Sequence, residues 1–311
     1  MKLSTYLHNG LQSCGIITEK GVIDIVSGAD GKIRSIHQVL TEGESAMAEI
    51  AGLADSAKDF IQIDDVKLLS PIPRPGKVIA LAGNYEKHII EGGLKLGLTE
   101  SPRTSTVPRP FLMPGTVITG PDSEIPWPAF SEQIDYEVEL AVIIGKAANC
   151  VPPSEALDYV AGYCIANDIS ARSVTFKENR KERPWDEFFD WLGGKWADGF
   201  LPLGPYLTTA DEIADVRALD LELSVNGRVR QKSNTSQMIF TVADIVSFLS
   251  FLMTLEPGDV IATGTPEGVA MATGDFLRPG DKIECKIENL GTLTNTLGNR
   301  PTQFYKPLSR I

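Results

Sequence analysis

Apolar and polar residues alternate along the start of the chain, and the period of the pattern then changes. The period of two predicts three short strands, at residues 2–8, 11–19 and 21–26. Apolar residues recur at helical spacing over 45–58, which predicts a helix there. Prolines at alternate positions of 71–75 form a stiff connector. We therefore expect a small N-terminal α/β cap domain at 1–70 and a larger second domain at 71–311.

Strand patterns dominate the second domain. Residues 77–84 form an apolar run that ends in a polar corner, which is typical of a buried strand. The pair Asn226-Gly227 stands between two alternating segments and favours the positive φ angles of a type I′ hairpin. Residues 240–255 predict one amphipathic helix that ends before a Pro-Gly-Asp turn. The sequence thus predicts a β-rich α+β fold with few helices.

Composition excludes several classes of function. The net charge of −12 argues against nucleic-acid binding, because phosphate backbones attract basic surfaces. No apolar stretch is long enough to span a membrane, and the N-terminus lacks the apolar core of a signal peptide. The four cysteines stand far apart, without the spacing of a zinc ribbon or a disulfide framework. We expect a cytoplasmic protein with reduced thiols, no nucleic-acid partner and no membrane association.

Three carboxylates are candidate metal ligands. Glu137 and Glu139 share one face of the predicted strand DYEVEL, since alternate side chains of a strand point the same way. Asp168 ends a second apolar run and adds a third carboxylate. Oxygen ligands of this kind suit Mg²⁺ and Mn²⁺, and also Ca²⁺. Two other interpretations stay open: the glutamates form a solvated strand edge, and Asp168 belongs to a turn or caps a helix.

A candidate general base follows the first strand of the second domain. His88 and Glu91 are three residues apart, so one helical turn would place them on the same face. A carboxylate bonded to one imidazole nitrogen fixes the tautomer and leaves the other nitrogen to take a proton from water. The alternative is an ordinary surface pair on a short helix.

Three further features could complete a site. Lys195 lies between glycines and a tryptophan, where its charge could stabilise an enolate or oxyanion, although an ordinary loop lysine is the commoner case. The turn ATGTPEGV presents backbone amides and the Thr265 hydroxyl, which could hold a carboxylate unless it is a plain β-turn. The aromatic and charged segment 176–194 is either a lid over the site or an amphipathic helix packed on a neighbour.

The order of these motifs resembles that of the fumarylacetoacetate hydrolase family. The matching motifs run from about residue 71 to 297: GNYEKHIIE at 83–91, DYEVEL at 135–140, NDISAR at 167–172, Lys195 ahead of a Pro-x-Gly-Pro turn, and GTPEGV at 264–269. The resemblance implies a mixed β-roll, usually in a homodimer, with an N-terminal cap. Members act on small acids with neighbouring keto groups, by C–C hydrolysis, decarboxylation, isomerisation or dehydration.

The resemblance also assigns roles to residues of this chain. It implies that Mg²⁺ or Mn²⁺ binds Glu137, Glu139 and Asp168 and acts as a Lewis acid. His88, oriented by Glu91, would activate water, and Lys195 would balance developing charge. Substrate contacts would come from three residues: Tyr85, Arg172 and Thr265.

The chain departs from the family pattern near these residues. Met113 stands where a lysine is common, and residues 173–175 replace an acidic residue and a glutamine. We expect these differences to affect the choice of substrate more than the class of reaction. The sequence predicts a metal-dependent hydrolase that cleaves a C–C bond in a 2,4-diketo acid such as an acylpyruvate. The alternatives are a lyase or isomerase with the same metal site and a ligand-sensing protein without catalysis.

Overall fold

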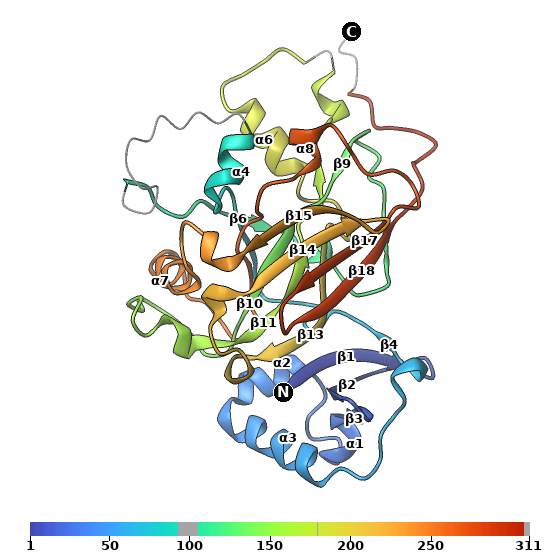
Figure 1. The fold of residues 1–311 in the computed structure, drawn as a ribbon, viewed down its shortest axis with the longest axis vertical. Coiled ribbons are helices and arrows are strands. Elements are labelled where there is room, and N and C mark those ends of the chain that lie inside the picture. The colour runs from blue at the N-terminus through green and yellow to red at the C-terminus, as the bar shows by residue number, and fades with distance from the viewer. Residues whose placement is uncertain (93–104, 179, 308–311) are drawn as a thin grey trace.

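The computed structural model describes residues 1–92, 105–178 and 180–307 (Figure 1). A unit of short strands and helices begins the chain, as the alternating and helical patterns predict. Its elements are β1 (Lys2–His8), β2 (Leu11–Thr18), β3 (Gly21–Asp24), α1 (Ile25–Gly28), α2 (Ile36–Glu42), α3 (Glu44–Ser56) and β4 (Lys67–Leu68). The predicted helix at 45–58 is confirmed as α3, within two residues at each end.

One long sheet runs through the molecule. In order across the sheet, its strands are β3, β2, β1, β13 (Leu201–Thr209), β11 (Val160–Asn167), β10 (Val138–Ile144), β16 (Val260–Ala262), β5 (Val78–Leu81) and β6 (Pro110–Met113). In addition, β4 pairs with β1, and β7 (Ile118–Thr119) pairs with β13. The pairs Lys2↔Thr208 and Leu3↔Leu207 join the N-terminal strands to this sheet. The N-terminal unit therefore extends the main sheet, and its division from the rest at residue 70 stays a prediction.

A second sheet packs over one face of the first. Its strands, in order, are β15 (Arg228–Asn234), β14 (Asp220–Val225), β17 (Lys282–Ile287), β18 (Gly291–Leu297) and β8 (Glu124–Ile125). A small ladder joins β9 (Ile134–Asp135) to β12 (Ser170–Ala171). The turn between β14 and β15 has φ angles of 51° at Asn226 and 77° at Gly227, so the predicted hairpin is confirmed.

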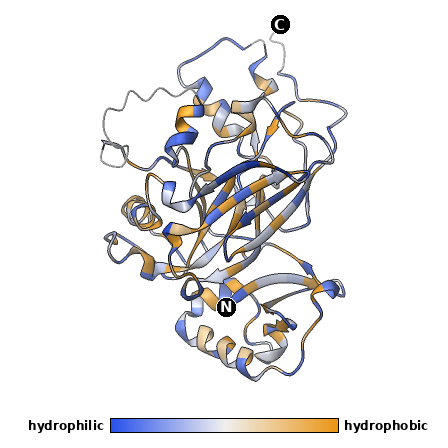
Figure 2. Ribbon diagram, in the orientation of Figure 1, coloured by the Kyte–Doolittle hydropathy of each residue, from blue (hydrophilic) through white to orange (hydrophobic). Residues whose placement is uncertain are grey.

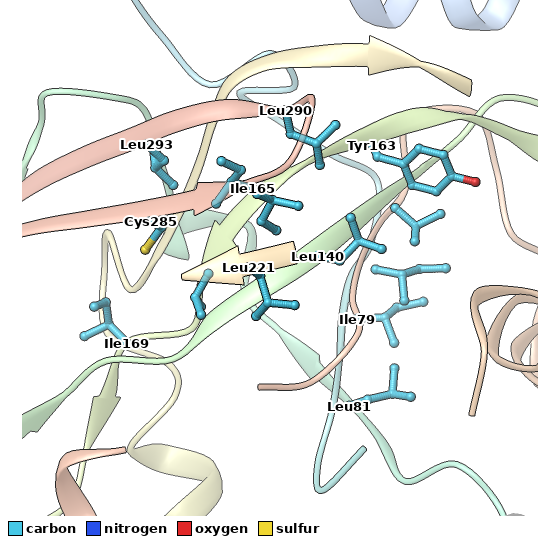
Figure 3. Close-up of a cluster of buried hydrophobic side chains, with 14 of the residues drawn as sticks. Ile79, Leu81, Leu140, Tyr163, Ile165, Ile169, Leu221, Cys285, Leu290 and Leu293 are labelled. Carbon is cyan, nitrogen blue, oxygen red and sulfur yellow. The ribbon is translucent and has the colours of Figure 1, made fainter. Parts of the chain in front are cut away.

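The main sheet is buried on both faces. Leu140 and Ile165 face the second sheet and meet Leu221, Cys285 and Leu293 from it (Figure 3). On the other face, alternate residues of the same strands belong to a second cluster, which includes side chains from α2 and α3. This double burial explains why DYEVEL continues into an unbroken apolar run, since neither face of β10 meets water.

The remaining helices lie around these sheets. They are α4 (Glu86–Glu91), α6 (Asp186–Gly193), α7 (Val242–Leu252) and α8 (Ala270–Thr273). Short 3₁₀ helices lie between elements: η1 (Ile63–Asp65), η2 (Gly115–Val117), η3 (Ala156–Tyr159), η4 (Thr175–Lys177), η5 (Ala210–Glu212), η6 (Val216–Ala218) and η7 (Thr235–Gln237). The predicted helix at 240–255 is confirmed as α7, where Thr241 and Asp244 form a capping box. Figure 2 colours α7 mainly as hydrophobic, in keeping with its buried face.

The strand-rich α+β fold is therefore as predicted, a mixed arrangement in which β5 and β16 run parallel among antiparallel neighbours. Among the described residues, no helix has both the length and the apolar character needed to cross a membrane. Helices α4, α6 and α8 gather at the end of the molecule away from the N-terminal unit (Figure 1). The strand ends beneath them form the site.

Candidate active site

Five strand ends meet at one end of the main sheet. Glu137 immediately precedes β10, and Asp168 immediately follows β11, its antiparallel neighbour. Thr265 follows β16, which is antiparallel to β10 and parallel to β5. Helix α4, with His88, follows β5, and β6 starts at the same end because it is antiparallel to β5. The topology thus gathers motifs that are far apart in the sequence.

The three predicted metal ligands lie together and are buried. Ligand atoms of Glu137, Glu139 and Asp168 are all within 4.8 Å of one another. The exposed fractions of these residues are only 5%, 1% and 1%, respectively. The solvated-edge interpretation of the glutamates is therefore wrong. The alternative role of Asp168 as a helix cap is wrong too, because the strand β12 follows it.

Each carboxylate is held in place by donors from other segments. The Lys195 Nζ atom donates to Glu137 Oε2 and to Asp168 Oδ2, at 2.7 Å in each case. The Gly264 amide donates to Glu139 Oε2 at 2.7 Å. Arg172 donates to the other oxygen of Glu137 through Nη2. The buried Asp168 Oδ1 atom has no hydrogen-bond partner among the described residues.

The electrostatics of the cluster are unbalanced. Burial would raise the pKa of Glu137, but Lys195 and Arg172 outweigh burial and lower it to about 2. Burial raises the pKa of Asp168 to about 6, although Lys195 opposes this effect. Burial, followed by the charges of Asp168 and Glu137, raises the pKa of Glu139 well above its usual range. Lys195 and Arg172 do not neutralise the three carboxylates, because Arg172 also pairs with the buried Asp135.

The donor set fits a hard divalent cation. It offers three carboxylates with oxygen atoms close enough to share one ion. Asp168 Oδ1 accepts no hydrogen bond from the described residues, so its lone pairs are available to a metal. The surplus of negative charge is what a divalent ion would neutralise. Mg²⁺, Mn²⁺ and Ca²⁺ all accept such oxygen ligands. Glu137, Glu139 and Asp168 are thus suited to hold the ion that the sequence predicts.

The predicted imidazole pair is also formed. His88 Nδ1 lies 3.1 Å from Glu91 Oε1 within α4. The Gly268 amide donates to both oxygens of Glu91, at 3.0 Å and 2.8 Å, so the turn GTPEGV fixes the carboxylate. Asn84 anchors the start of the segment by donating to the carbonyls of Phe240 and Thr263. Glu91 therefore occupies Nδ1 of the ring and leaves Nε2 for proton transfer.

A cavity of about 470 Å³ is lined by His88 of the pair and by two of the three metal ligands, Glu137 and Asp168. Its charged and ionisable lining residues are His88, Arg109, Glu137, Asp168, Arg172 and Lys195. His88, Glu137 and Asp168 thus border one cavity, as a reaction between a metal-held substrate and a water molecule requires. His88 lines the cavity, and Glu91 accepts a hydrogen bond from the Gly268 amide. The alternative of an ordinary surface pair is therefore contradicted.

The predicted substrate-contact residues occupy different positions. The Thr265 side chain lines the cavity, while its hydroxyl donates to the Val138 carbonyl and accepts from Gln231. Arg172 lines the cavity too, but two of its nitrogens already donate to Asp135 and Glu137. Tyr85 is only 1% exposed and does not line the cavity. Burial, with help from Glu139, raises the pKa of Tyr85, so its phenol keeps its proton.

Helix α6, which belongs to the predicted lid segment, borders one side of the cavity. Phe188 and Trp191 of α6 line it, and the Trp191 ring packs edge-on against Phe111 of β6, with 4.8 Å between centroids. The segment is fastened by Arg180, whose two terminal nitrogens donate to Asp190 at 2.6 Å and 2.7 Å. The aromatic residues thus cover the site, as the lid interpretation predicts, while Trp191 also packs on the sheet, as the alternative predicts.

Two buried polar residues of the site are not predicted from the sequence. Asp135 accepts hydrogen bonds from Arg172 Nε and from the amides of Ala270 and Met271, so it joins the Arg172 guanidinium to the start of α8. Gln231 bonds both Val138 and Thr265. Asp135 begins the DYEVEL motif and could have been noticed there, whereas nothing in the alternation of β15 distinguishes Gln231 from a solvated side chain.

Met113 does not contact the cavity. It belongs to the buried cluster on the other face of the main sheet, at the end of β6 away from the site. The expectation that this position reads the substrate is therefore wrong. The start of β6, not its end, borders the cavity.

Comparisons with known proteins agree with the geometry. The family described as fumarylacetoacetate (FAA) hydrolase C-terminal matches residues 77–298. The mitochondrial oxaloacetate tautomerase Fahd2a of Rattus norvegicus is 36% identical over 290 residues, covering 93% of this chain and 86% of the relative. Because that relative is mitochondrial, the cytoplasmic location stays a prediction.

Solved structures show the same fold. A fumarylacetoacetate hydrolase from Exiguobacterium antarcticum has a TM-score of 0.79 at 33% identity, covering 96% of this chain and all (100%) of that chain. A maleylpyruvate hydrolase from Sphingobium sp. SYK-6, in complex with manganese(II) and pyruvate, has a TM-score of 0.76 at 28% identity and covers 97% and 100% of the two chains. These relatives include hydrolases and a tautomerase, and a divalent metal in the acidic cluster agrees with the manganese complex. The chain belongs to the fumarylacetoacetate hydrolase family of enzymes.

Proposed function

We propose that the protein is a divalent-metal-dependent hydrolase that cleaves a C–C bond in a small 2,4-diketo acid of the acylpyruvate type. The observation that carries this proposal is the cavity lined by His88 and by two carboxylates of the acidic cluster, Glu137 and Asp168. A metal-held keto acid in that cavity would lie beside an imidazole oriented to take a proton. The relative that binds manganese and pyruvate is consistent with a keto-acid ligand.

The ion and the protein would have different roles in the reaction. Mg²⁺ or Mn²⁺, held by Glu137, Glu139 and Asp168, would supply Lewis-acid polarisation of the keto-acid oxygens. His88 Nε2 would accept a proton from water, while Glu91 holds the ring and stabilises the imidazolium. The glutamate is itself fixed by Gly268, so the base does not need to reorient.

The proposed reaction consumes one water molecule and breaks one C–C bond. The oxygen of water bonds to the distal carbonyl carbon of the diketo acid, and the bond from that carbon to the central methylene breaks. The electron pair passes to the methylene carbon, which takes up a proton. The products are a carboxylic acid and pyruvate. Lys195 would stabilise the negative charge that develops on the enolate oxygen, given its buried position beside two ligands.

A second candidate is tautomerisation of oxaloacetate, which the 36% identical rat relative favours. The same His88 would then move a proton between a carbon and an enol oxygen, and no water would be consumed. Decarboxylation or isomerisation could use the same cavity. A ligand-sensing protein would bind the keto acid without turnover.

Turnover assays separate these functions. The Mg²⁺-loaded protein is incubated with an acylpyruvate and with oxaloacetate, and pyruvate formation and keto–enol equilibration are followed separately. We expect pyruvate from the acylpyruvate, with His88→Ala reducing kcat by about 10²–10⁴-fold because a general base is lost. The matched control is His8→Ala, since His8 ends β1 in the N-terminal unit. Keto–enol equilibration of oxaloacetate without pyruvate from any diketo acid would identify a tautomerase instead.

A further inference from the structure

The cavity is lined by three permanently cationic side chains, and two of them are already engaged. The Lys195 ammonium donates to Glu137 and Asp168. The Arg172 guanidinium donates to Asp135 and Glu137, with its side chain 9% exposed. Arg109 is the third cation, and it has no carboxylate partner among residues 1–92, 105–178 and 180–307. Arg109 therefore has a charge that no protein group within this part of the chain neutralises.

The position of Arg109 is set by the sheet. It immediately precedes β6, and its carbonyl accepts from the Ala82 amide at 3.0 Å. Three strand steps separate β6 from β10, through β5 and β16. At the usual strand spacing, this places the two backbones roughly 14 Å apart. Arg109 and the metal ligands thus border the same cavity from two separated strands.

The wall between these ends is apolar. It includes Leu81 and Ile89 from the β5–α4 segment, Phe111 from β6, and Trp191 from α6. Such a wall suits the carbon chain of a ligand. Apart from His88, whose Nδ1 atom contacts Glu91, it offers no partner to a second charged group on that chain. Any second charge would therefore be placed at the far end, near Arg109, which is exposed to solvent.

We propose that Arg109 is a specificity residue that binds a second, distal carboxylate of the substrate, so that the preferred substrates are dicarboxylic keto acids. This inference rests on the proposed function for placing the keto-acid end at Glu137, Glu139 and Asp168. The planar guanidinium can donate two parallel hydrogen bonds to a carboxylate, which neutral side chains of the apolar wall cannot do. With a monocarboxylic keto acid bound, the N–H groups of the Arg109 guanidinium would face water instead.

Two six-carbon probes isolate the distal group. They are 2-oxoadipate and 2-oxohexanoate, which share the keto-acid end and differ only in a terminal carboxylate or methyl group. Their dissociation constants are measured by calorimetry with the Mg²⁺-loaded protein. We expect the wild type to bind 2-oxoadipate about tenfold more tightly, as one charge-assisted hydrogen-bonded pair near solvent provides.

The variants test whether Arg109 causes the preference. Arg109→Met should abolish the preference and leave 2-oxohexanoate binding unchanged, which also shows that the variant is folded. Arg109→Lys should keep part of the preference, because it retains a charge without the planar fork. Arg74→Met removes another exposed arginine, from the connector, and should behave as the wild type. Equal binding of both probes by the wild type, or a preference that persists in Arg109→Met, would overturn the assignment.

The result is separable from the proposed hydrolysis. A protein that shows the Arg109-dependent preference but forms no pyruvate from any 2,4-diketo acid supports this inference and refutes the hydrolase. A protein that hydrolyses an acylpyruvate without distinguishing the two probes refutes this inference and leaves the hydrolase standing.

Discussion

Replacing Asp135 with Asn should lower the free energy of unfolding by more than the same substitution in an exposed ion pair does. Asp135 is completely buried and accepts from Arg172 Nε at 2.9 Å, and from the amides of Ala270 and Met271 at 2.6 Å and 3.0 Å. Asn has nearly the same shape, but it carries no charge and has one acceptor oxygen where the carboxylate has two. The variant therefore leaves buried donors, including part of a guanidinium, without partners.

The magnitude follows from the burial of this pair. Removing one member of a buried ion pair costs about 3–5 kcal/mol when the other charge is left unpaired. The lower end of this range applies here, because Arg172 keeps Glu137 as a partner. Arg172 also donates to Glu137, so its reorientation disturbs a metal ligand. Changes in groups that orient metal ligands lower metal affinity by about 10–100-fold. We expect both effects in Asp135→Asn.

Urea unfolding and Mn²⁺ calorimetry measure these two effects. The matched control is Asp275→Asn, which removes the partner of Arg230 from an ion pair whose carboxylate side chain is 38% exposed. The Arg230 side chain is 17% exposed, so water solvates part of this pair, and unfolding should change less than in Asp135→Asn. If Asp135→Asn unfolds at the same urea concentration as Asp275→Asn and binds Mn²⁺ like the wild type, the role given to Asp135 is refuted.

Other expected results concern the metal cluster. Chelation by EDTA should abolish activity and added Mg²⁺ or Mn²⁺ should restore it, whereas unchanged rates after complete chelation would exclude a metal mechanism. Glu137→Gln should weaken metal binding far more than Glu91→Gln, because only Glu137 belongs to the cluster; calorimetry showing equal losses would contradict this. Burial raises the pKa of Asp168 to about 6, and burial raises that of Glu139 as well. Because a bound metal requires the deprotonated carboxylates, metal affinity should rise from pH 5 to pH 7 and binding should release protons. Calorimetry in buffers of different ionisation enthalpy detects this release, and a pH-independent affinity would argue against it.

Local patterns in the sequence predict the elements well. The Asn226-Gly227 hairpin, α3 and α7 follow from turn chemistry and apolar periodicity, which act between near neighbours. The pairing of β1 with β13 does not follow in this way, since it joins residues about two hundred positions apart. The sequence therefore does not reveal that the N-terminal strands extend the main sheet, and the domain boundary at residue 70 stays a prediction.

The candidate site is predicted in part. Ordered motifs identify the carboxylate cluster and the His88–Glu91 pair, because those side chains carry recognisable chemistry at fixed spacing. Asp135 and Gln231 act through hydrogen bonds to segments distant in the chain, which spacing does not reveal. Arg109 stands out only when the partners of Lys195 and Arg172 are known. The charge balance of a cavity is a property of the folded molecule.

A crystal structure of the protein with Mn²⁺ and pyruvate, measured at a wavelength that gives anomalous scattering from manganese, is the decisive test of the proposed metal and keto-acid site. We predict one strong anomalous peak, from a manganese ion that is bonded to oxygens of Glu137, Glu139 and Asp168. Pyruvate should be bound to this ion inside the cavity that His88 lines. Manganese absent from these carboxylates, or bound there with the keto acid outside that cavity, would contradict the account.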